Sequence, residues 1–238
     1  MQKIPLNEWL TSTEIGHSIV ELEKNWLEQI TATWFGRFSL QLGDVGTQIF
    51  KTNSRINKHA VITFSQQKQS DICAQFDALP FANESIDGIV VSHILEQSAQ
   101  PFEILKELER VLSADKSVVI LAINPYSFYG LWQLTGAWQT TATLHSSKTL
   151  QKMLLNLGFE ITEQYHGMCR PPLQNVSRWQ RLRWLENYCY RWGGVYALVA
   201  KKNRLAMPTH LISKIKYKNQ WVGIAEPSLL SHDNDASR

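Results

Sequence analysis

The sequence predicts an α/β fold with a doubly wound, mostly parallel sheet of seven strands, and one continuous stretch of chain carries the prediction. Residues 88–91 form a short apolar run rich in β-branched residues, as expected for a central strand covered on both faces. After Pro101, apolar residues recur at helical spacing and the other face is charged. Residues 118–123 then form a second apolar run. A strand, a helix and a strand in this order predict a right-handed parallel unit.

The other elements follow from the same two periodicities. Apolar residues three or four positions apart predict an amphipathic N-terminal helix over residues 13–31. Ser147 is suited to cap a later helix, and Gly158 supplies the left-handed residue that commonly ends one. Apolar segments predict five further strands, at residues 38–42, 59–64, 72–76, 161–166 and 195–201. Together with the central unit, they make the expected seven strands.

Length and composition favour one domain. A chain of 238 residues with 44% hydrophobic content can build one α/β domain with a substantial core, an insertion and a tail. We expect the domain to span residues 1–202, with a helical insertion at residues 167–193, before the last strand. Residues 203–238 are polar and irregular, which predicts a flexible C-terminal tail.

Charge and cysteine content exclude several classes of protein. The formal charge of +3 is compatible with an acidic ligand or RNA but requires neither. Three cysteines without C-x-x-C spacing indicate neither a disulfide framework nor a zinc site, so we expect no metal and a reducing, cytoplasmic location. No apolar stretch approaches the length of a bilayer span, so we expect neither a membrane helix nor a signal peptide.

A family resemblance appears in residues 79–130. In order, they contain LPF, S-I-D, an apolar strand, S-H-x-L-E, a helix ending in R-V-L, a turn and a second apolar strand. This order resembles the class I S-adenosylmethionine-dependent methyltransferases, in particular the methyltransferase type 11 family. The resemblance implies a Rossmann-like sheet whose last strand is antiparallel, S-adenosylmethionine as the cofactor, and transfer of its methyl group to an acceptor. In an open parallel sheet, such a ligand belongs at the carboxyl ends of the strands, near the point where strand order reverses.

The loop after the first strand resembles the cofactor loop of this family only in part. The family has an acid, one residue and then G-x-G-x-G, whereas this chain reads Q-L-G-D-V-G-T from Gln41. Gly43 fits the first glycine, and Gly46 lies one position out of step. Gln41 replaces the acid and loses the charge that would strengthen a bond to the ammonium group, for which Asp44 compensates if the loop is shifted. The other interpretation is an ordinary strand-ending turn.

The resemblance also places residues around the nucleoside. Relatives carry an acid for the ribose hydroxyls after the second strand, where this chain has Thr63, Phe64 and Ser65. Asp71 is the next acid, and the chain before it is short enough to imply the loss of one helix. Three residues are expected at the adenine, after the third strand: Gln75, Phe76 and Asp77.

Ser92 and His93 follow the fourth strand, where relatives place residues near the methionyl group and the transferred methyl group. His93 is therefore expected at the cofactor and is the candidate general base. The alternative is a polar side chain satisfied by its neighbours at a strand end.

Two aromatic-rich segments are candidates for the acceptor cavity. Tyr126, Tyr129 and Trp132 lie in the connection after the fifth strand, and Arg178 and Trp179 lie in the insertion. The insertion is predicted to be an amphipathic lid helix over the substrate. Alternatively, its arginine and aromatic side chains would stack bases and bind RNA phosphates.

The sequence thus predicts an S-adenosylmethionine-dependent methyltransferase that acts on an unidentified acceptor, expected to be a small molecule. The departures in the cofactor loop and at the ribose position favour a second hypothesis, a catalytically inactive binding or regulatory module with the same fold. An RNA-binding protein is a third.

Overall fold

The computed structural model describes residues 4–43, 45, 55–64, 70–135, 138, 140–168, 193–203 and 216–218. Eight strands form one sheet in the order β3-β2-β1-β4-β5-β7-β6-β8. The strands are β1 (Phe35–Leu42), β2 (Arg55–Thr63), β3 (Ile72–Cys73), β4 (Ile86–Ser92), β5 (Leu112–Ile123), β6 (Phe159–Gly167), β7 (Val195–Lys202) and β8 (Lys216–Lys218). The helices are α1 (Leu6–Ser12), α2 (Glu14–Thr31), α3 (Pro101–Val111), α4 (Phe128–Leu134) and α5 (Ser147–Asn156). The predicted α/β class is confirmed, and β8 adds a short eighth strand at one edge.

The direction of the strands defines a switch point in the middle of the sheet. β1 pairs in parallel with both β2 and β4, and β4 pairs in parallel with β5. β7 runs antiparallel between β5 and β6, as the family resemblance implied. The chain leaves β1 toward β2 and β3 on one side, and then returns to β4 on the other side. The strand order therefore reverses between β1 and β4, the place where open α/β sheets bind ligands.

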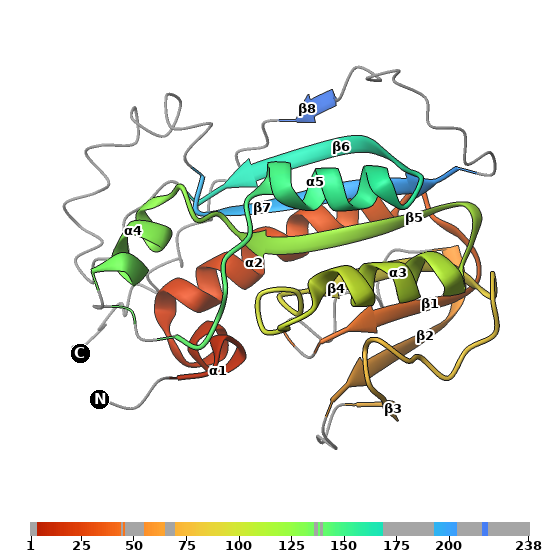
Figure 1. Ribbon diagram of the computed structural model, residues 1–238, viewed down its shortest axis with the longest axis horizontal. Helices are drawn as coiled ribbons and strands as arrows, with labels where there is room; N and C mark the ends of the chain where they lie inside the picture. The colour runs from red at the N-terminus through yellow and green to blue at the C-terminus, as the bar shows by residue number, and fades with distance from the viewer. Residues whose placement is uncertain are drawn as a thin grey trace, which may run out of the picture.

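Helices cover both faces of the sheet (Figure 1): α3 and α5 lie on one face, and α2 lies on the other. Because side chains of a strand alternate between faces, neighbouring residues of β4 belong to different cores. Ile89 and Val91 pack with the buried residues of α3 and α5, whereas Val90 packs with those of α2. This explains the uninterrupted apolar run in β4, because both of its faces are buried.

The N-terminal helices are set by a cap and an apolar stripe. The Thr13 hydroxyl accepts a hydrogen bond from the Gly16 N–H at 3.0 Å, which starts α2 one residue after the predicted position. A separate short helix, α1, precedes this cap and buries Leu6, Trp9 and Leu10. The spacing of these three residues is helical, so the sequence carried a signal for α1 that the prediction of a single helix over residues 13–31 did not use.

Three connections differ from the expectation. The polar residues 113–117, predicted to be a turn, belong to β5, which begins at Leu112 directly after α3 and is extended by its pairing with β4 and β7. β3 ends at Cys73, because the next residues turn and the Ala78 N–H bonds back to the Gln75 carbonyl at 3.3 Å. The aromatic connection contains α4, which Ser127 caps.

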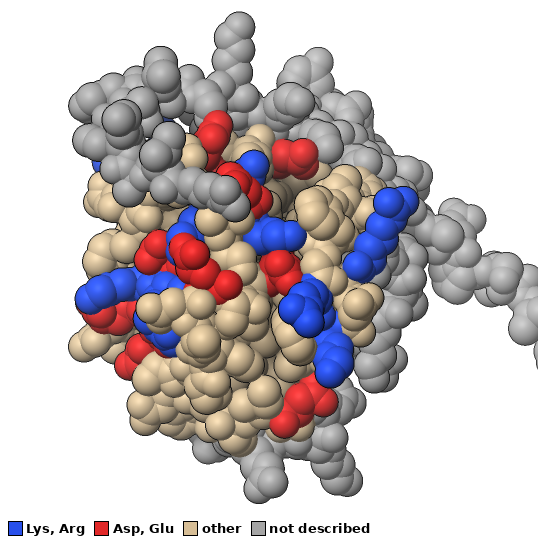
Figure 2. Space-filling view, turned by 90° about the vertical axis from the view of Figure 1, so that its right-hand side faces the viewer, with Lys and Arg blue, Asp and Glu red and all other residues tan. Residues whose placement is uncertain are grey.

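The described surface mixes charges of both signs. On the face that Figure 2 shows, lysine and arginine side chains alternate with aspartate and glutamate side chains. Near the amino ends of the parallel strands, Lys116 pairs with Asp87 at 3.4 Å, and Lys202 pairs with Glu109 at 3.0 Å. Among the described residues of this face, such intermingling leaves no broad basic area to attract a polyanion.

Several predictions fall on parts of the chain that the structure does not describe. Residues 169–192 of the expected lid, and all of the expected tail except residues 203 and 216–218, lie outside the described residues. Residues 46–54 and 65–69, which bear on the helix expected to be lost, are also outside them. Among the described residues, no helix is long and apolar enough to cross a membrane, and no cluster of His, Cys, Asp and Glu could hold a metal ion.

Candidate functional site

A cavity of about 850 Å³ lies at the carboxyl ends of β1 to β4, at the switch point of the sheet. Each of the four strands contributes residues that follow it, and α1 supplies a further wall. The described lining residues are Pro5, Asn7, Glu8, Thr11, Gly43, Thr63, Phe64, Gln75, Phe76, Asp77, Ile94, Gln97, Ser98, Gln100 and Ile104. The cavity therefore occupies the position that the topology of the sheet predicts for a ligand.

Gly43 is the residue that leads the chain out of β1 into this cavity. Its φ of 95° lies in the left-handed region, which residues with a side chain rarely adopt. A Cβ atom at this position would lie 2.6 Å from the Ser92 carbonyl oxygen. The Gly43 N–H donates to the Ile62 carbonyl at 3.0 Å, which holds the turn against β2. The glycine thus lets the loop pass close to β4, where a side chain would collide with the Ser92 carbonyl.

Gln41 and Ser92 brace the loop from behind and do not line the cavity. The Gln41 side-chain amide donates to the Gly43 carbonyl at 3.1 Å and to the Val45 carbonyl at 3.3 Å. The Ser92 hydroxyl also donates to the Val45 carbonyl, at 3.3 Å. Both side chains are buried. The Ser92 hydroxyl and the Gln41 amide nitrogen thus support the backbone of the loop, whereas Gln41 Oε1 is buried without a hydrogen-bond partner among the described residues.

The nucleoside residues expected from the sequence lie together at the β2 and β3 side of the cavity. Gln75, Phe76 and Asp77 line it, as do Thr63 and Phe64, and the Phe64 side chain is 73% exposed. Asp71 does not line the cavity. Its carboxylate instead accepts a hydrogen bond from the Val61 N–H of β2 at 2.9 Å. Asp44 and Gly46 lie outside the described residues.

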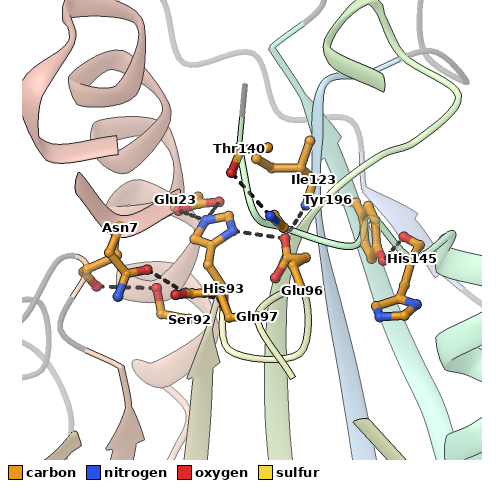
Figure 3. A network of polar contacts seen from close by, with 12 residues as sticks. Asn7, Glu23, Ser92, His93, Glu96, Gln97, Ile123, Thr140, His145 and Tyr196 are labelled. Carbon is orange, nitrogen blue, oxygen red and sulfur yellow. Dashed lines mark hydrogen bonds and ion pairs between the residues drawn. The ribbon is translucent and has the colours of Figure 1, made fainter. Parts of the chain in front are cut away.

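His93 lies in a buried cluster with two carboxylates (Figure 3). Its Nε2 atom is 3.0 Å from Glu23 Oε1 of α2, and its Nδ1 atom is 3.1 Å from Glu96 Oε1. All three side chains are almost completely shielded from solvent. Glu96 Oε1 also accepts the Ile123 N–H at the end of β5 at 2.8 Å. The cluster therefore joins α2 to the carboxyl ends of β4 and β5.

The two carboxylates determine the protonation of His93. Burial disfavours the charged imidazolium, but Glu23 and Glu96 outweigh this effect and raise the pKa of His93 to about 10. The ring is protonated at neutral pH, so both of its nitrogens donate hydrogen bonds and neither can accept a proton. His93 does not line the cavity. The geometry thus favours an anchoring role for His93 over the general base and cofactor contact suggested by its sequence position.

A hydrogen-bonded link connects this cluster to α1 and to the cavity. The Gln97 side-chain amide donates to the His93 carbonyl at 2.8 Å and to the Asn7 side-chain oxygen at 2.6 Å. Gln97, Asn7 and the neighbouring Glu8 all line the cavity. That α1 lines the cavity was not predicted from the sequence, although the helical spacing of the buried residues in α1 could have indicated a helix there.

The aromatic residues expected around the acceptor pack against the opposite side of α1. Trp9 lies 6.2 Å from Tyr129 and 6.4 Å from Trp132, measured between ring centroids. Trp138 lies 4.8 Å from Trp9 and stacks on Trp132. Tyr126 is 72% exposed, and none of these residues lines the cavity. Two candidates from the insertion, Arg178 and Trp179, lie outside the described residues.

In a comparison with protein families, residues 34–120 match the model of the methyltransferase type 11 family, a methyltransferase domain. The matched segment runs from the start of β1 into β5, and so includes every strand end that borders the cavity. The resemblance drawn from residues 79–130 is therefore confirmed. The protein YafS of Escherichia coli (strain K12) is 27% identical over 210 residues, which cover 83% of this chain and 83% of YafS.

Solved structures show the same fold at low sequence identity. A chain from the complex between the Haloferax volcanii Trm112 methyltransferase activator and a methyltransferase superimposes with a TM-score of 0.60 at 16% identity, covering 84% of this chain and 96% of that one. A SAM-dependent methyltransferase from Archaeoglobus fulgidus gives a TM-score of 0.54 at 18% identity, with 82% and 97% of the two chains covered. At these identities, the likeness shows the shared architecture.

Proposed function

We propose that this chain, which carries a methyltransferase domain of the type 11 family in residues 34–120, binds S-adenosylmethionine and transfers its methyl group to a small-molecule acceptor. The observation that carries the proposal is the cavity of about 850 Å³ at the switch point between β1 and β4. Its volume lies within the range of about 300 to 1,000 Å³ that is usual for small-molecule sites. All four strand ends that border it belong to the matched segment.

The residues around the cavity fit this cofactor. Gly43 lines the cavity and has no side chain that could cover its backbone. The charged residues in the described lining are the carboxylates of Glu8 and Asp77, and the described lining contains no lysine, arginine or histidine. S-adenosylmethionine carries a sulfonium and an ammonium group, and carboxylates are the side chains that stabilise such cations. The sign of the charge in the cavity therefore supports the proposal.

The main tasks of the protein in this reaction would be to position the two reactants and to exclude water. When bound, S-adenosylmethionine supplies an electrophilic methyl group whose loss leaves the thioether S-adenosylhomocysteine. The protein must hold the cofactor and acceptor in line and keep water out, and such positioning can lower the barrier by several kcal/mol, up to about 7 to 11. The Gly43 loop, α1 and the loop after β4 are the described segments that would perform this task.

Calorimetric titration of the purified protein with S-adenosylhomocysteine tests the cofactor. We expect binding with a dissociation constant in the micromolar range, about −8 kcal/mol. S-inosylhomocysteine is the control ligand. It differs from S-adenosylhomocysteine only in that an oxygen replaces the adenine amino group, and it should bind more weakly. A flat titration up to millimolar ligand would remove the support for an enzyme.

A second candidate function is a catalytically inactive module of the same fold. The observation in its favour is that neutral side chains, Gln41 and Thr63, stand where relatives have acids, and Gln41 is engaged with its own loop. Loss of a hydrogen bond to a charged group costs about 1.5 to 3 kcal/mol, enough to weaken the cofactor contact strongly. Binding of S-adenosylhomocysteine without turnover of S-adenosylmethionine in the presence of a metabolite extract would favour this module.

RNA as the acceptor or partner has less support. The described lining is acidic, and the face in Figure 2 mixes charges of both signs. Affinity for RNA that falls steeply with added salt would restore this hypothesis, because phosphate contacts release counterions.

A further inference from the structure

The missing acid of the cofactor loop raises the question of which residue holds the cofactor's ammonium group. Gln41, at the position of that acid, is neutral and buried, and its amide bonds to two carbonyls of its own loop. A neutral amide is also a weaker partner for an ammonium group than a carboxylate. Gln41 Oε1 has no hydrogen-bond partner among the described residues and could accept a neutral hydrogen bond, but a charge-assisted bond to the ammonium group requires a carboxylate.

The described lining of the cavity contains two carboxylates, and the sheet places them at opposite ends. Asp77 follows β3, while Glu8 sits beside Asn7, which bonds to Gln97 in the loop after β4. The strand order is β3-β2-β1-β4, and neighbouring strands are about 4.8 Å apart, so β3 and β4 are separated by about 14 Å. Figure 1 shows α1 on the side toward which β1 and β5 point. A cofactor with a nucleoside at one end and an amino acid at the other would span this distance.

Aromatic residues indicate which end takes the nucleoside. Phe64 and Phe76 line the cavity on the β2 and β3 side, together with Gln75 and Asp77. Aromatic faces stack on purine bases, and amide and carboxylate oxygens accept hydrogen bonds from amino and hydroxyl groups. Among the described residues, the opposite end, beside α1 and the loop after β4, is lined by the polar side chains of Asn7, Thr11 and Gln97 and by the carboxylate of Glu8.

The geometry points to Glu8 as the carboxylate that binds the ammonium group of the cofactor, in place of the acid that relatives carry in the loop after β1. This inference rests on the proposed function, and it makes α1 part of the cofactor site. In the described part of the chain, neither Glu8 nor Asp77 forms an ion pair. Glu8 is exposed to solvent, so its carboxylate is open to an incoming cation. Trp9, packed between Tyr129 and Trp138, holds α1 in place beside the cavity.

The test compares two ligands on the wild-type protein and three variants. S-adenosylhomocysteine carries the amino acid, whereas 5′-methylthioadenosine retains the nucleoside and the sulfur and lacks the amino acid. Calorimetry should show that Glu8→Gln weakens S-adenosylhomocysteine roughly ten- to a hundredfold, as expected for the loss of a charge-assisted bond, and leaves 5′-methylthioadenosine within about twofold. Asp77→Asn, at the nucleoside end, should weaken both ligands by a similar factor.

Glu14→Gln is the matched control. Glu14 is an exposed glutamate in the first turn of α2 and does not line the cavity, so its replacement should change neither affinity. The inference is overturned if Glu8→Gln leaves S-adenosylhomocysteine unchanged, or if it weakens both ligands equally, because Glu8 would then act on the nucleoside or on the docking of α1. It is also overturned if the wild-type protein binds only 5′-methylthioadenosine. If the wild-type protein binds neither ligand, the proposed function itself fails.

Discussion

Replacing His93 with Asn is expected to lower the free energy of unfolding by roughly 3 to 5 kcal/mol, the cost of leaving buried charges without their partner. The imidazolium of His93 lies between the carboxylates of Glu23 and Glu96, and all three groups are buried. Removing the cation leaves two carboxylates facing each other without compensation. Asn is the suitable replacement because His93 has a φ of 54°, a left-handed conformation that Asn tolerates better than most residues.

The same cluster predicts how stability changes with pH. The pKa of His93 is raised to about 10 in the folded protein by its two carboxylate partners, although burial opposes this, against about 6.5 in the unfolded chain. Folding therefore binds a proton between these two values. The contribution of His93 to stability is fully present below about pH 6.5 and is lost as the pH rises toward about 10. Wild-type protein should unfold at lower urea concentration at pH 9 than at pH 7, and His93→Asn should reduce this difference.

His17→Asn is the matched control for both measurements. His17 lies exposed on α2, so the same exchange of side chains there should change the free energy of unfolding by no more than about 0.5 kcal/mol and leave the pH dependence intact. A His93→Asn variant as stable as the wild-type protein at pH 7 would contradict the anchoring role. An unchanged pH dependence in this variant would show that other groups cause it.

The second large effect is expected from Gly43→Val, which should weaken S-adenosylhomocysteine at least a hundredfold. The Cβ of a side chain at this position would lie 2.6 Å from the Ser92 carbonyl oxygen and 3.1 Å from Ile94 Cδ1, on the wall of the cavity. The φ of 95° adds strain for any residue with a side chain. The loop must therefore shift, and the remaining space would be blocked at the point where the ligand approaches the backbone. Calorimetry measures the affinity.

Gly158→Val separates this local effect from a general loss of stability. Gly158 also has a positive φ, of 81°, but it ends α5 and does not line the cavity. The variant should lose stability and keep its affinity for S-adenosylhomocysteine. Both variants are first compared by circular dichroism and thermal unfolding. Unchanged affinity in a folded Gly43→Val protein would move the binding site away from this loop.

Local patterns in the sequence were sufficient for the central part of the fold. The apolar run of β4, the amphipathic face of α3 and the apolar end of β5 each depend on residues that are close in sequence, so periodicity identified all three. The same holds for the position of the cavity, because the carboxyl ends of parallel strands meet at one edge of the sheet. The bounds of these elements were less predictable, since β5 also includes the polar residues 113–117, of which Ser117 pairs with both β4 and β7.

What only the tertiary structure decided is which distant side chains meet. His93 follows a strand end in the way a candidate base would, and only folding brings Glu23 of α2 against it, 70 residues away in sequence. Folding likewise places Glu8 of α1 on the cavity, and packs Tyr129 and Trp132 against Trp9, away from it. Periodicity reports which face of an element is buried, but it does not specify the partner that buries it. The sequence therefore determined the sheet and the location of the cavity, and the packing of α1 and α2 determined which charged groups lie around it and beside it.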